Sequence, residues 1–233
     1  MTVLTDNAIE NSSMTVGVVA GTPTDTRFGL DFLAARQLRG VGLSLSSSPQ
    51  AQTQLQALER DALTKQLIEA IEQLYQAGAE AAMIYCNSLS GAVDMTAVKA
   101  ASPIEVVSPL EVYAELTQRY RNFGLLAANC QSCANIEREI LERNTTAKVI
   151  GIGNLQIVED IEDGLAAEMI VQQHALDDLV SALVKSGVQI LILGCTHFDY
   201  FYRELLAHCD GIRLFLPSER MLELLQERIP QAA

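Results

Sequence analysis

Basic residues are scarce in this sequence of 233 residues, which has 16 Lys and Arg against 29 Asp and Glu. The formal net charge is therefore −13. Nucleic acids and anionic membranes are bound through clustered Lys and Arg, so this charge argues against both as partners. It does not exclude an acidic small molecule, because a binding site can be locally positive inside an acidic protein.

Long hydrophobic runs are also missing. The longest apolar stretches are about seven or eight residues, too short to span a bilayer. The first residues, MTVLTDNAIENSS, are polar and acidic and lack the apolar run of a signal peptide. We expect residues 1–14 to form a flexible tail. Five cysteines are an odd number and form no small disulfide-rich frame, so we expect free thiols in a reducing cytoplasm.

The remaining chain alternates between short apolar runs and longer stretches with helical spacing. Hydrophobic residues make up 49% of the sequence, enough for a substantial core. The runs predict buried strands at 15–21, 42–45, 81–86, 104–107, 123–128, 148–153, 189–194 and 212–216. The clearest helical stretches are 50–76, 109–121, 136–144, 161–186 and 218–228. Strands apolar on both faces and joined by helices indicate an α/β fold with doubly wound parallel sheets.

An internal repeat divides this pattern in two. Residues 68–88 read IEAIEQLYQAGAEAAMIYCNS, and residues 177–197 read DDLVSALVKSGVQILILGCTH. Each has a helix, a Gly cap, a strand and then a cysteine, with Cys86 and Cys195 109 positions apart. VGVVAGT and FGLLAAN form a second pair, offset by 107. We expect two pseudo-symmetric lobes facing each other across a cleft, one formed by 15–108 plus 217–233 and the other by 109–216.

The repeat places Cys86 and Cys195 at the carboxyl ends of strands, where open parallel sheets bind their ligands. If the lobes face each other, the two thiols approach one ligand from opposite sides. A racemase needs this arrangement, because one group removes a proton from one face and the other delivers a proton to the opposite face. Thiols suit both roles, since the thiol pKa of about 8.5 can be lowered by its environment.

These motifs resemble those of the aspartate/glutamate racemase family, within the Asp/Glu/hydantoin racemase superfamily. CNS at 86–88 is similar to the family's CNT motif, and GCTH at 194–197 matches its second motif. The resemblance covers nearly all of residues 15–228. It implies a homodimeric enzyme that uses no pyridoxal phosphate, and we expect no other cofactor and no metal. One cysteine would act as a thiolate and the other as a thiol on an acidic amino acid.

The resemblance also implies roles for neighbouring residues. His197 would sit beside Cys195 and tune its protonation. Candidate substrate-binding residues from the motifs and from the loop at 128–132 are Asn87, Ser88, Thr196, Asn129 and Ser132. The first strand-end loop, 20–27, adds Thr22 and Arg27. That loop lacks the acid of glutamate racemases, so it is closer to that of aspartate racemases. Glu162 is a possible match for an auxiliary acid of glutamate racemases.

Several structural interpretations stand beside these roles. Cys86 could be an ordinary buried cysteine, while Ser88, Thr196 and His197 could cap helices. A solvated charge is a better interpretation of Arg27 than a substrate-binding group, and the same interpretation is favoured for Asp25. His174 and His208 are expected on helix surfaces or at an interface.

Three alternative functions remain open. The first is a sister activity, such as hydantoin racemisation, maleate isomerisation or malonate decarboxylation. The second uses the CxxC pair Cys130 and Cys133 for dithiol redox chemistry, or as half of a zinc site. The third is a protein that binds an amino acid without turning it over. The motifs do not distinguish aspartate from glutamate.

Overall fold

The computed structural model describes residues 4–5, 14–55 and 59–229. The chain divides into two compact units, each with its own sheet. The first unit comprises Met1–Pro109 and Ser218–Ala233, and the second comprises Leu110–Pro217.

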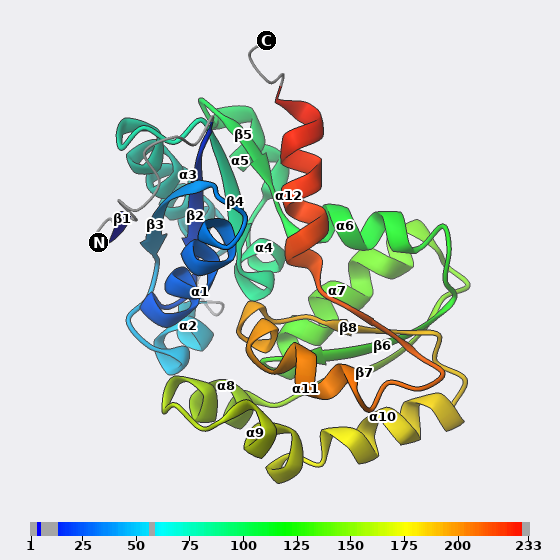
Figure 1. Cartoon of the computed structure of the whole chain (residues 1–233). Helices are drawn as coiled ribbons and strands as arrows, with labels where there is room; N and C mark the ends of the chain where they lie inside the picture. The colour runs from blue at the N-terminus through cyan, green and yellow to red at the C-terminus, as the bar shows by residue number, and fades with distance from the viewer. Residues whose placement is uncertain (1–3, 6–13, 56–58, 230–233) are drawn as a thin grey trace. The chain divides into compact units, whose positions relative to one another are not determined.

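The sheet of the first unit has the strand order β1-β3-β2-β4-β5 (Figure 1). Its parallel strands are β2 (Thr15–Ala20), β3 (Arg39–Ser44), β4 (Ala81–Tyr85) and β5 (Glu105–Val107). Strand β1 (Leu4–Thr5) pairs antiparallel with β3, although it falls in the segment for which the sequence predicts a tail. Residues 1–3 and 6–13 of that segment lie outside the described residues.

Helices cover both faces of this sheet. They are α1 (Pro23–Ala34), α2 (Pro49–Leu55), α3 (Arg60–Gln76), α4 (Asn87–Ala92), α5 (Met95–Ala101) and α12 (Pro217–Arg228). Helix α3 faces Gly17, whose hypothetical Cβ would lie 3.0 Å from Leu74. Helix α1 faces the neighbouring Val18, which lies against Gly29. Because alternate strand residues point to opposite faces, both faces of β2 are buried, which explains its continuous apolar run.

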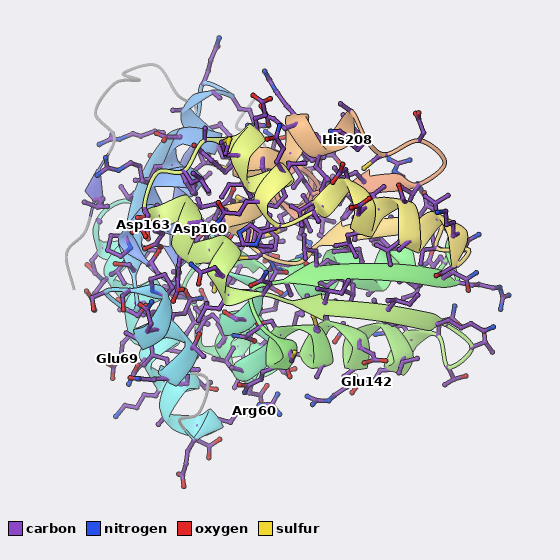
Figure 2. The ribbon with its side chains drawn as sticks, turned by 90° about the horizontal axis from the view of Figure 1, so that it is seen from below. Arg60, Glu69, Glu142, Asp160, Asp163 and His208 are labelled. Atoms are coloured by element: carbon purple, nitrogen blue, oxygen red, sulfur yellow. The ribbon has the colours of Figure 1, made fainter. Side chains whose placement is uncertain are left out.

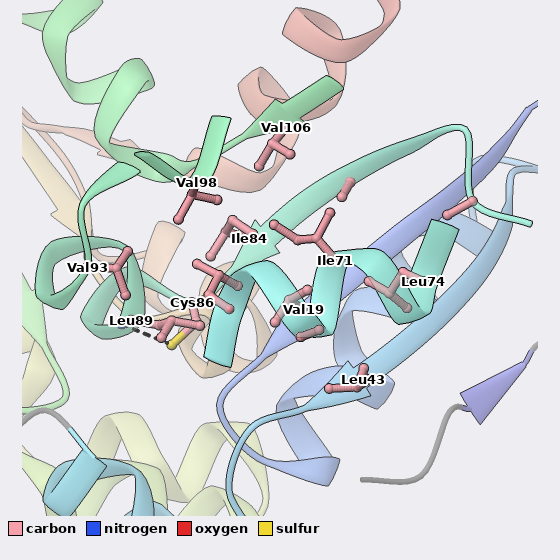
Figure 3. Packing of buried hydrophobic residues seen from close by; sticks show 14 of the residues in the cluster. Val19, Leu43, Ile71, Leu74, Ile84, Cys86, Leu89, Val93, Val98 and Val106 are labelled. Carbon is pink, nitrogen blue, oxygen red and sulfur yellow. Dashed lines mark hydrogen bonds between the residues drawn. The ribbon is translucent and has the colours of Figure 1, made fainter. Parts of the chain in front are cut away.

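The apolar core between the sheet and α3 is shown in Figure 3. It includes Val19 and Leu43 from the strands and Ile71 and Leu74 from the helix. Cys86, the residue that follows β4, belongs to the same buried cluster. The core therefore extends up to the end of the strand where the first candidate thiol lies.

The second unit has a four-stranded parallel sheet in the order β7-β6-β8-β9. Its strands are β6 (Asn122–Ala127), β7 (Lys148–Gly153), β8 (Ile190–Leu193) and β9 (Arg213–Phe215). The helices are α6 (Pro109–Leu116), α7 (Cys130–Arg143), α8 (Leu155–Glu162), α9 (Ala167–Gln173), α10 (Leu176–Lys185), the 3₁₀ helix η1 (Thr196–Phe201) and α11 (Tyr202–Leu206). Helix α10 packs on the face of Gly124, whereas α7 packs on the opposite face through Ile136 and Ile140.

The two units repeat one topology, which confirms the predicted α/β fold with two similar parallel-sheet lobes. Without β1, the orders β3-β2-β4-β5 and β7-β6-β8-β9 correspond strand by strand. The helix before β4 and the helix before β8 also end alike. Gly78 and Gly187 have φ angles of 96° and 77°. In each turn the next residue donates its backbone N–H to the helix, from Ala79 to Leu74 and from Val188 to Leu183.

Two predicted helices are wrong in their extent. The stretch 161–186 is interrupted because Gly164, with φ of 82°, follows α8, and Ala175, with φ of 49°, precedes α10. Both residues adopt a left-handed conformation that a continuous helix does not allow. The stretch 50–76 is divided into α2 and α3, with residues 56–58 between them outside the described part of the chain.

Candidate functional site

The first candidate thiol, Cys86, sits at the junction between β4 and α4. Its backbone is extended, its side chain is 2% exposed, and its Sγ accepts a hydrogen bond from the backbone N–H of Leu89 at 3.4 Å (Figure 3). The sulfur thus takes the place of an N-cap oxygen. An N–H directed at sulfur favours the charged thiolate, so this position suits an acid–base thiol as well as a structural one.

Two more groups surround this sulfur. The Gln52 Nε2 atom lies 2.9 Å from Cys86 Sγ and 2.8 Å from Ser88 Oγ. Ser88 Oγ itself is 3.3 Å from the sulfur. Asn87 and Ser88 are both buried. Gln52 was not among the residues predicted from the sequence, because nothing in the polar stretch PQAQTQL distinguishes it from its neighbours.

The loop after β2 lies at the same end of the sheet, because Ala20 is in register with Tyr85 of β4. Thr22 is fully buried and caps α1, accepting a hydrogen bond from the Asp25 backbone N–H at 3.2 Å. Arg27 is exposed, in line with the solvated-charge interpretation. The same interpretation is wrong for Asp25, which is 1% exposed. The first turn of α1 turns this carboxylate away from solvent, which sequence spacing alone does not indicate.

The second candidate thiol, Cys195, follows β8 and precedes η1. It is 9% exposed, and its Sγ lies 3.7 Å from His197 Nδ1. His197 Nε2 lies 2.9 Å from Glu162 Oε1, at the end of α8. These contacts connect thiol, imidazole and carboxylate. A carboxylate on the far ring nitrogen orients an imidazole, here with its other nitrogen toward the sulfur.

Tyr113, from α6, is a further buried group near this thiol. Burial raises the pKa of Tyr113 well above its usual value, and the negative charges of Cys195 and Asp199 raise it further. Its phenol therefore remains protonated at neutral pH.

The loop after β6 supplies two polar atoms that fit a ligand. Asn129 caps α7 by accepting a hydrogen bond from the Ser132 backbone N–H at 2.8 Å. Among the described residues, neither Asn129 Nδ2 nor Ser132 Oγ has a hydrogen-bond partner, although both atoms are buried. Buried polar atoms of this kind are costly unless something binds them. Leu126 is in register with Leu193, so this loop lies at the same sheet end as Cys195.

Gly153, in the neighbouring strand β7, makes room for that loop. A Cβ at Gly153 would lie 2.2 Å from the Asn129 carbonyl carbon and 2.3 Å from the Cys130 nitrogen. Backbone atoms cannot move aside as a flexible side chain can. The close packing of two backbones therefore determines where Asn129 and Ser132 lie.

No disulfide joins any of the five cysteines, all of which are within the described residues. Cys130 is exposed and Cys133 is buried. Burial is the main cause that raises the pKa of Cys133 to about 11, and the negative charges of Cys130 and Glu137 also contribute. In the part of the chain that the structure describes, no group of three or more His, Cys, Asp or Glu is arranged to hold a metal ion.

The two other histidines differ from each other. His208 is exposed, as predicted. The surface prediction is wrong for His174, whose side chain is only 9% exposed and whose Nε2 lies 2.7 Å from Asp160 Oδ2. Asp160 lies on α8, two positions before Glu162, and is labelled in Figure 2 with Asp163. Tertiary packing of α9 on α8 buries a histidine that would otherwise face solvent.

Fold and site together define a protein of two similar α/β units, each presenting a buried cysteine at the carboxyl end of a central strand. A sequence profile of the family Asp/Glu/Hydantoin racemase matches residues 30–225. The chain belongs to this family.

Individual relatives are similar to this chain in sequence or in fold. Glutamate racemase from Latilactobacillus sakei is 29% identical over 161 residues, which are 65% of this chain and 57% of that protein. The match thus spans less than two thirds of that relative. A glutamate racemase isoform from Bacillus anthracis has a similar fold, with a TM-score of 0.72 at 18% identity, covering 96% of this chain and 85% of that one.

A third similar structure is an aspartate racemase homologue from Pyrococcus horikoshii. Its TM-score is 0.67 at 17% identity, and the match covers 92% of this chain and 98% of that one. Identities this low establish a shared fold only. Among the described helices, none is both long and apolar enough to cross a membrane.

Proposed function

We propose that this protein is an amino-acid racemase that interconverts the L and D forms of glutamate, aspartate or both without a cofactor. The observation that carries the proposal is the repetition of one thiol environment. Cys86 and Cys195 each follow the corresponding strand of a repeated sheet, and each precedes the start of a helix. Family membership supports the reaction class, and similarity to a glutamate racemase favours glutamate.

In the proposed reaction, one cysteine thiolate removes the α-proton from one face of the substrate. The thiol of the other cysteine donates its proton to the opposite face, which inverts the configuration of the α-carbon. The two roles exchange in the reverse direction. The Glu162–His197 pair would keep Cys195 ready for proton transfer. Asn129 Nδ2 and Ser132 Oγ would bind a substrate carboxylate, since both can donate hydrogen bonds.

Proton NMR in D2O tests this proposal directly. The L and D forms of glutamate and aspartate are each incubated with the purified protein, with no cofactor added. We expect loss of the α-proton signal together with appearance of the opposite enantiomer. Early in the reaction the product should carry deuterium at the α-carbon, while the remaining substrate keeps its proton. The reason is that one cysteine removes the α-proton and the other, already exchanged with D2O, donates to the opposite face. No exchange with any of the four substrates would overturn the proposal in favour of a sister reaction or a binding protein.

The variants Cys86→Ala and Cys195→Ala test the two-thiol mechanism. Each should lower racemisation by about 100-fold or more, since each removes one acid–base group. Cys130→Ser is the matched control, because this thiol is exposed and has no role in the proposed reaction. Near-normal turnover in either alanine variant, measured on protein that unfolds like the parent in urea, would refute the mechanism.

A further inference from the structure

Gln52, a residue outside both cysteine motifs, packs against Gly21 in the loop after β2. A Cβ built on Gly21 would lie 2.0 Å from Gln52 Oε1, 2.1 Å from its Cδ and 2.2 Å from its Nε2. The carboxamide of Gln52 therefore fills the volume that any side chain at position 21 would need. Glycine at this position leaves room for a polar group that comes from a different element, α2.

Hydrogen bonds hold the start of α2 next to this loop. Ser46 donates both its backbone N–H and its hydroxyl to the carbonyl of Gly21, at 2.9 and 2.7 Å. The Ser46 hydroxyl is also 3.2 Å from the Ser48 carbonyl, and the Gln52 N–H donates to that same carbonyl at 2.9 Å. The position of Gln52 is thus tied to Gly21 through successive contacts.

The same carboxamide contacts the candidate thiol. Its Nε2 carries two N–H groups, which can donate to Cys86 Sγ at 2.9 Å and to Ser88 Oγ at 2.8 Å at once. The Ser88 hydroxyl, 3.3 Å from the sulfur, can donate its own proton when the sulfur is a thiolate. With the N–H of Leu89, three donors converge on one sulfur. A neutral thiol is a weak acceptor, so three donors match a thiolate better.

We propose that Gln52 is a catalytic residue that stabilises and orients the Cys86 thiolate, with Gly21 as the position that admits its carboxamide. This inference rests on the function proposed above. Gln52 acts on the reacting sulfur itself, both directly and through Ser88. Removing its N–H groups makes the thiolate harder to form and leaves Ser88 free to rotate.

The variant Gln52→Leu tests this role, because it removes both N–H groups and keeps most of the bulk. Gln54→Leu is the matched control, since Gln54 is exposed on the same helix. Alkylation of Cys86 by iodoacetamide, followed by peptide mass spectrometry as a function of pH, reports the thiolate of this cysteine without requiring activity. We expect the midpoint of the Cys86 titration to rise by about one pH unit or more in Gln52→Leu and to be unchanged in Gln54→Leu.

Turnover gives the second readout. Gln52→Leu should lower kcat by about 10-fold to 100-fold with little change in KM, because the lost interaction is made with the base rather than with the substrate. Gln52→Glu keeps the shape of the side chain but puts a negative charge beside the sulfur. It should raise the titration midpoint further than Gln52→Leu does, because the added charge repels the thiolate.

A double-mutant cycle tests the link to Gly21. Gly21→Ala should reproduce the effects of Gln52→Ala, because the added methyl group displaces the carboxamide. In the Gln52→Ala background the same change should add little further loss, since the space is then empty. Additive losses, or an unchanged Cys86 midpoint in Gln52→Leu, would overturn the inference.

The two proposals fail in distinguishable ways. If the wild type racemises no substrate but the Cys86 midpoint still depends on Gln52, the racemase proposal fails and Gln52 loses its catalytic role, although its contact with the thiolate stands. If the wild type racemises and the midpoint does not move, the function stands and the inference about Gln52 is wrong.

Discussion

At the residue scale, Cys86 and Cys195 are surrounded by different hydrogen-bonding groups. Neutral donors from Gln52, Ser88 and Leu89 surround the first sulfur. The second sulfur lies beside His197, whose far nitrogen contacts a carboxylate. A neutral amide keeps its donors over the whole physiological pH range, whereas an imidazole gains or loses a proton within it. The two sulfurs are therefore held by partners of different chemistry.

The carboxylate of Glu162 is expected to matter for turnover. Glu162→Gln keeps the size of the side chain but removes the charge that orients His197. Under the proposed function, kcat should fall by about 10-fold to 1000-fold with a smaller change in KM. The neighbouring Asp163→Asn is the control, since Asp163 is exposed (Figure 2). Steady-state racemisation rates check this, and equal rates in the two variants would exclude a role for the Glu162–His197 pair.

At the element scale, each unit repeats a strand, a capping residue and a helix. Thr22 after β2, Asn129 after β6 and Asn154 after β7 all cap the next helix through a side-chain oxygen. Such caps direct the first N–H groups of each helix toward the carboxyl end of the sheet. The candidate site residues are therefore held on rigid strand-to-helix junctions rather than on long loops.

Helices α8 and α9 are joined by a hydrogen bond between Asp160 and His174. Hydrogen bonds from Gln156 and His174 lower the pKa of Asp160. Because the folded pKa lies below the unfolded value of about 3.9, the carboxylate stabilises the fold above that pH, and this stability is lost as pH falls through the folded pKa.

Asp160→Asn should therefore lower the free energy of unfolding by about 1 kcal/mol at neutral pH. The difference from the parent should shrink as the pH falls from about 4 through the lower folded pKa of Asp160, because the parent's carboxylate is then protonated in both states. Urea unfolding at several pH values measures this, with Asp178→Asn, an exposed position on α10, as the control. A pH-independent difference would mean that the charge of Asp160 makes no contribution.

At the scale of the whole molecule, two units of the same topology each enclose their own core. Each core supports one thiol-bearing strand end. The surface of the chain is acidic overall, with a formal net charge of −13. Any acidic substrate must therefore be bound by local donors, such as Asn129 Nδ2 and Ser132 Oγ, rather than attracted by the net charge of the protein.

The net charge predicts chromatographic behaviour. At low ionic strength and neutral pH the protein should pass through a heparin column unretained and bind to an anion-exchange column, because repulsion by sulfates is long-ranged when salt is scarce. Retention on heparin would show a concentrated basic surface and would contradict the expectation that nucleic acid is not a partner.

Much of the fold could be predicted because burial on both faces leaves a strong signal. Every predicted strand, from 15–21 to 212–216, corresponds to one in the structure, with bounds shifted by at most a few residues. The helix breaks at Gly164 and Ala175 were missed, since a left-handed residue leaves the surrounding apolar spacing intact. For the candidate site, spacing and repetition indicated both cysteines, whereas His197 was implied by the resemblance to the family's second motif.

What the sequence by itself determined about this protein is the alternation of apolar strands and helices, its repetition, and the position of a cysteine after the corresponding strand in each half. These are local properties, written in neighbouring residues. Only the tertiary structure decided that Gln52 contacts Cys86, that Glu162 contacts His197 and that Asp25 is buried. Such contacts join residues up to 35 positions apart. They depend on how helices pack at the ends of the strands, which no short pattern records.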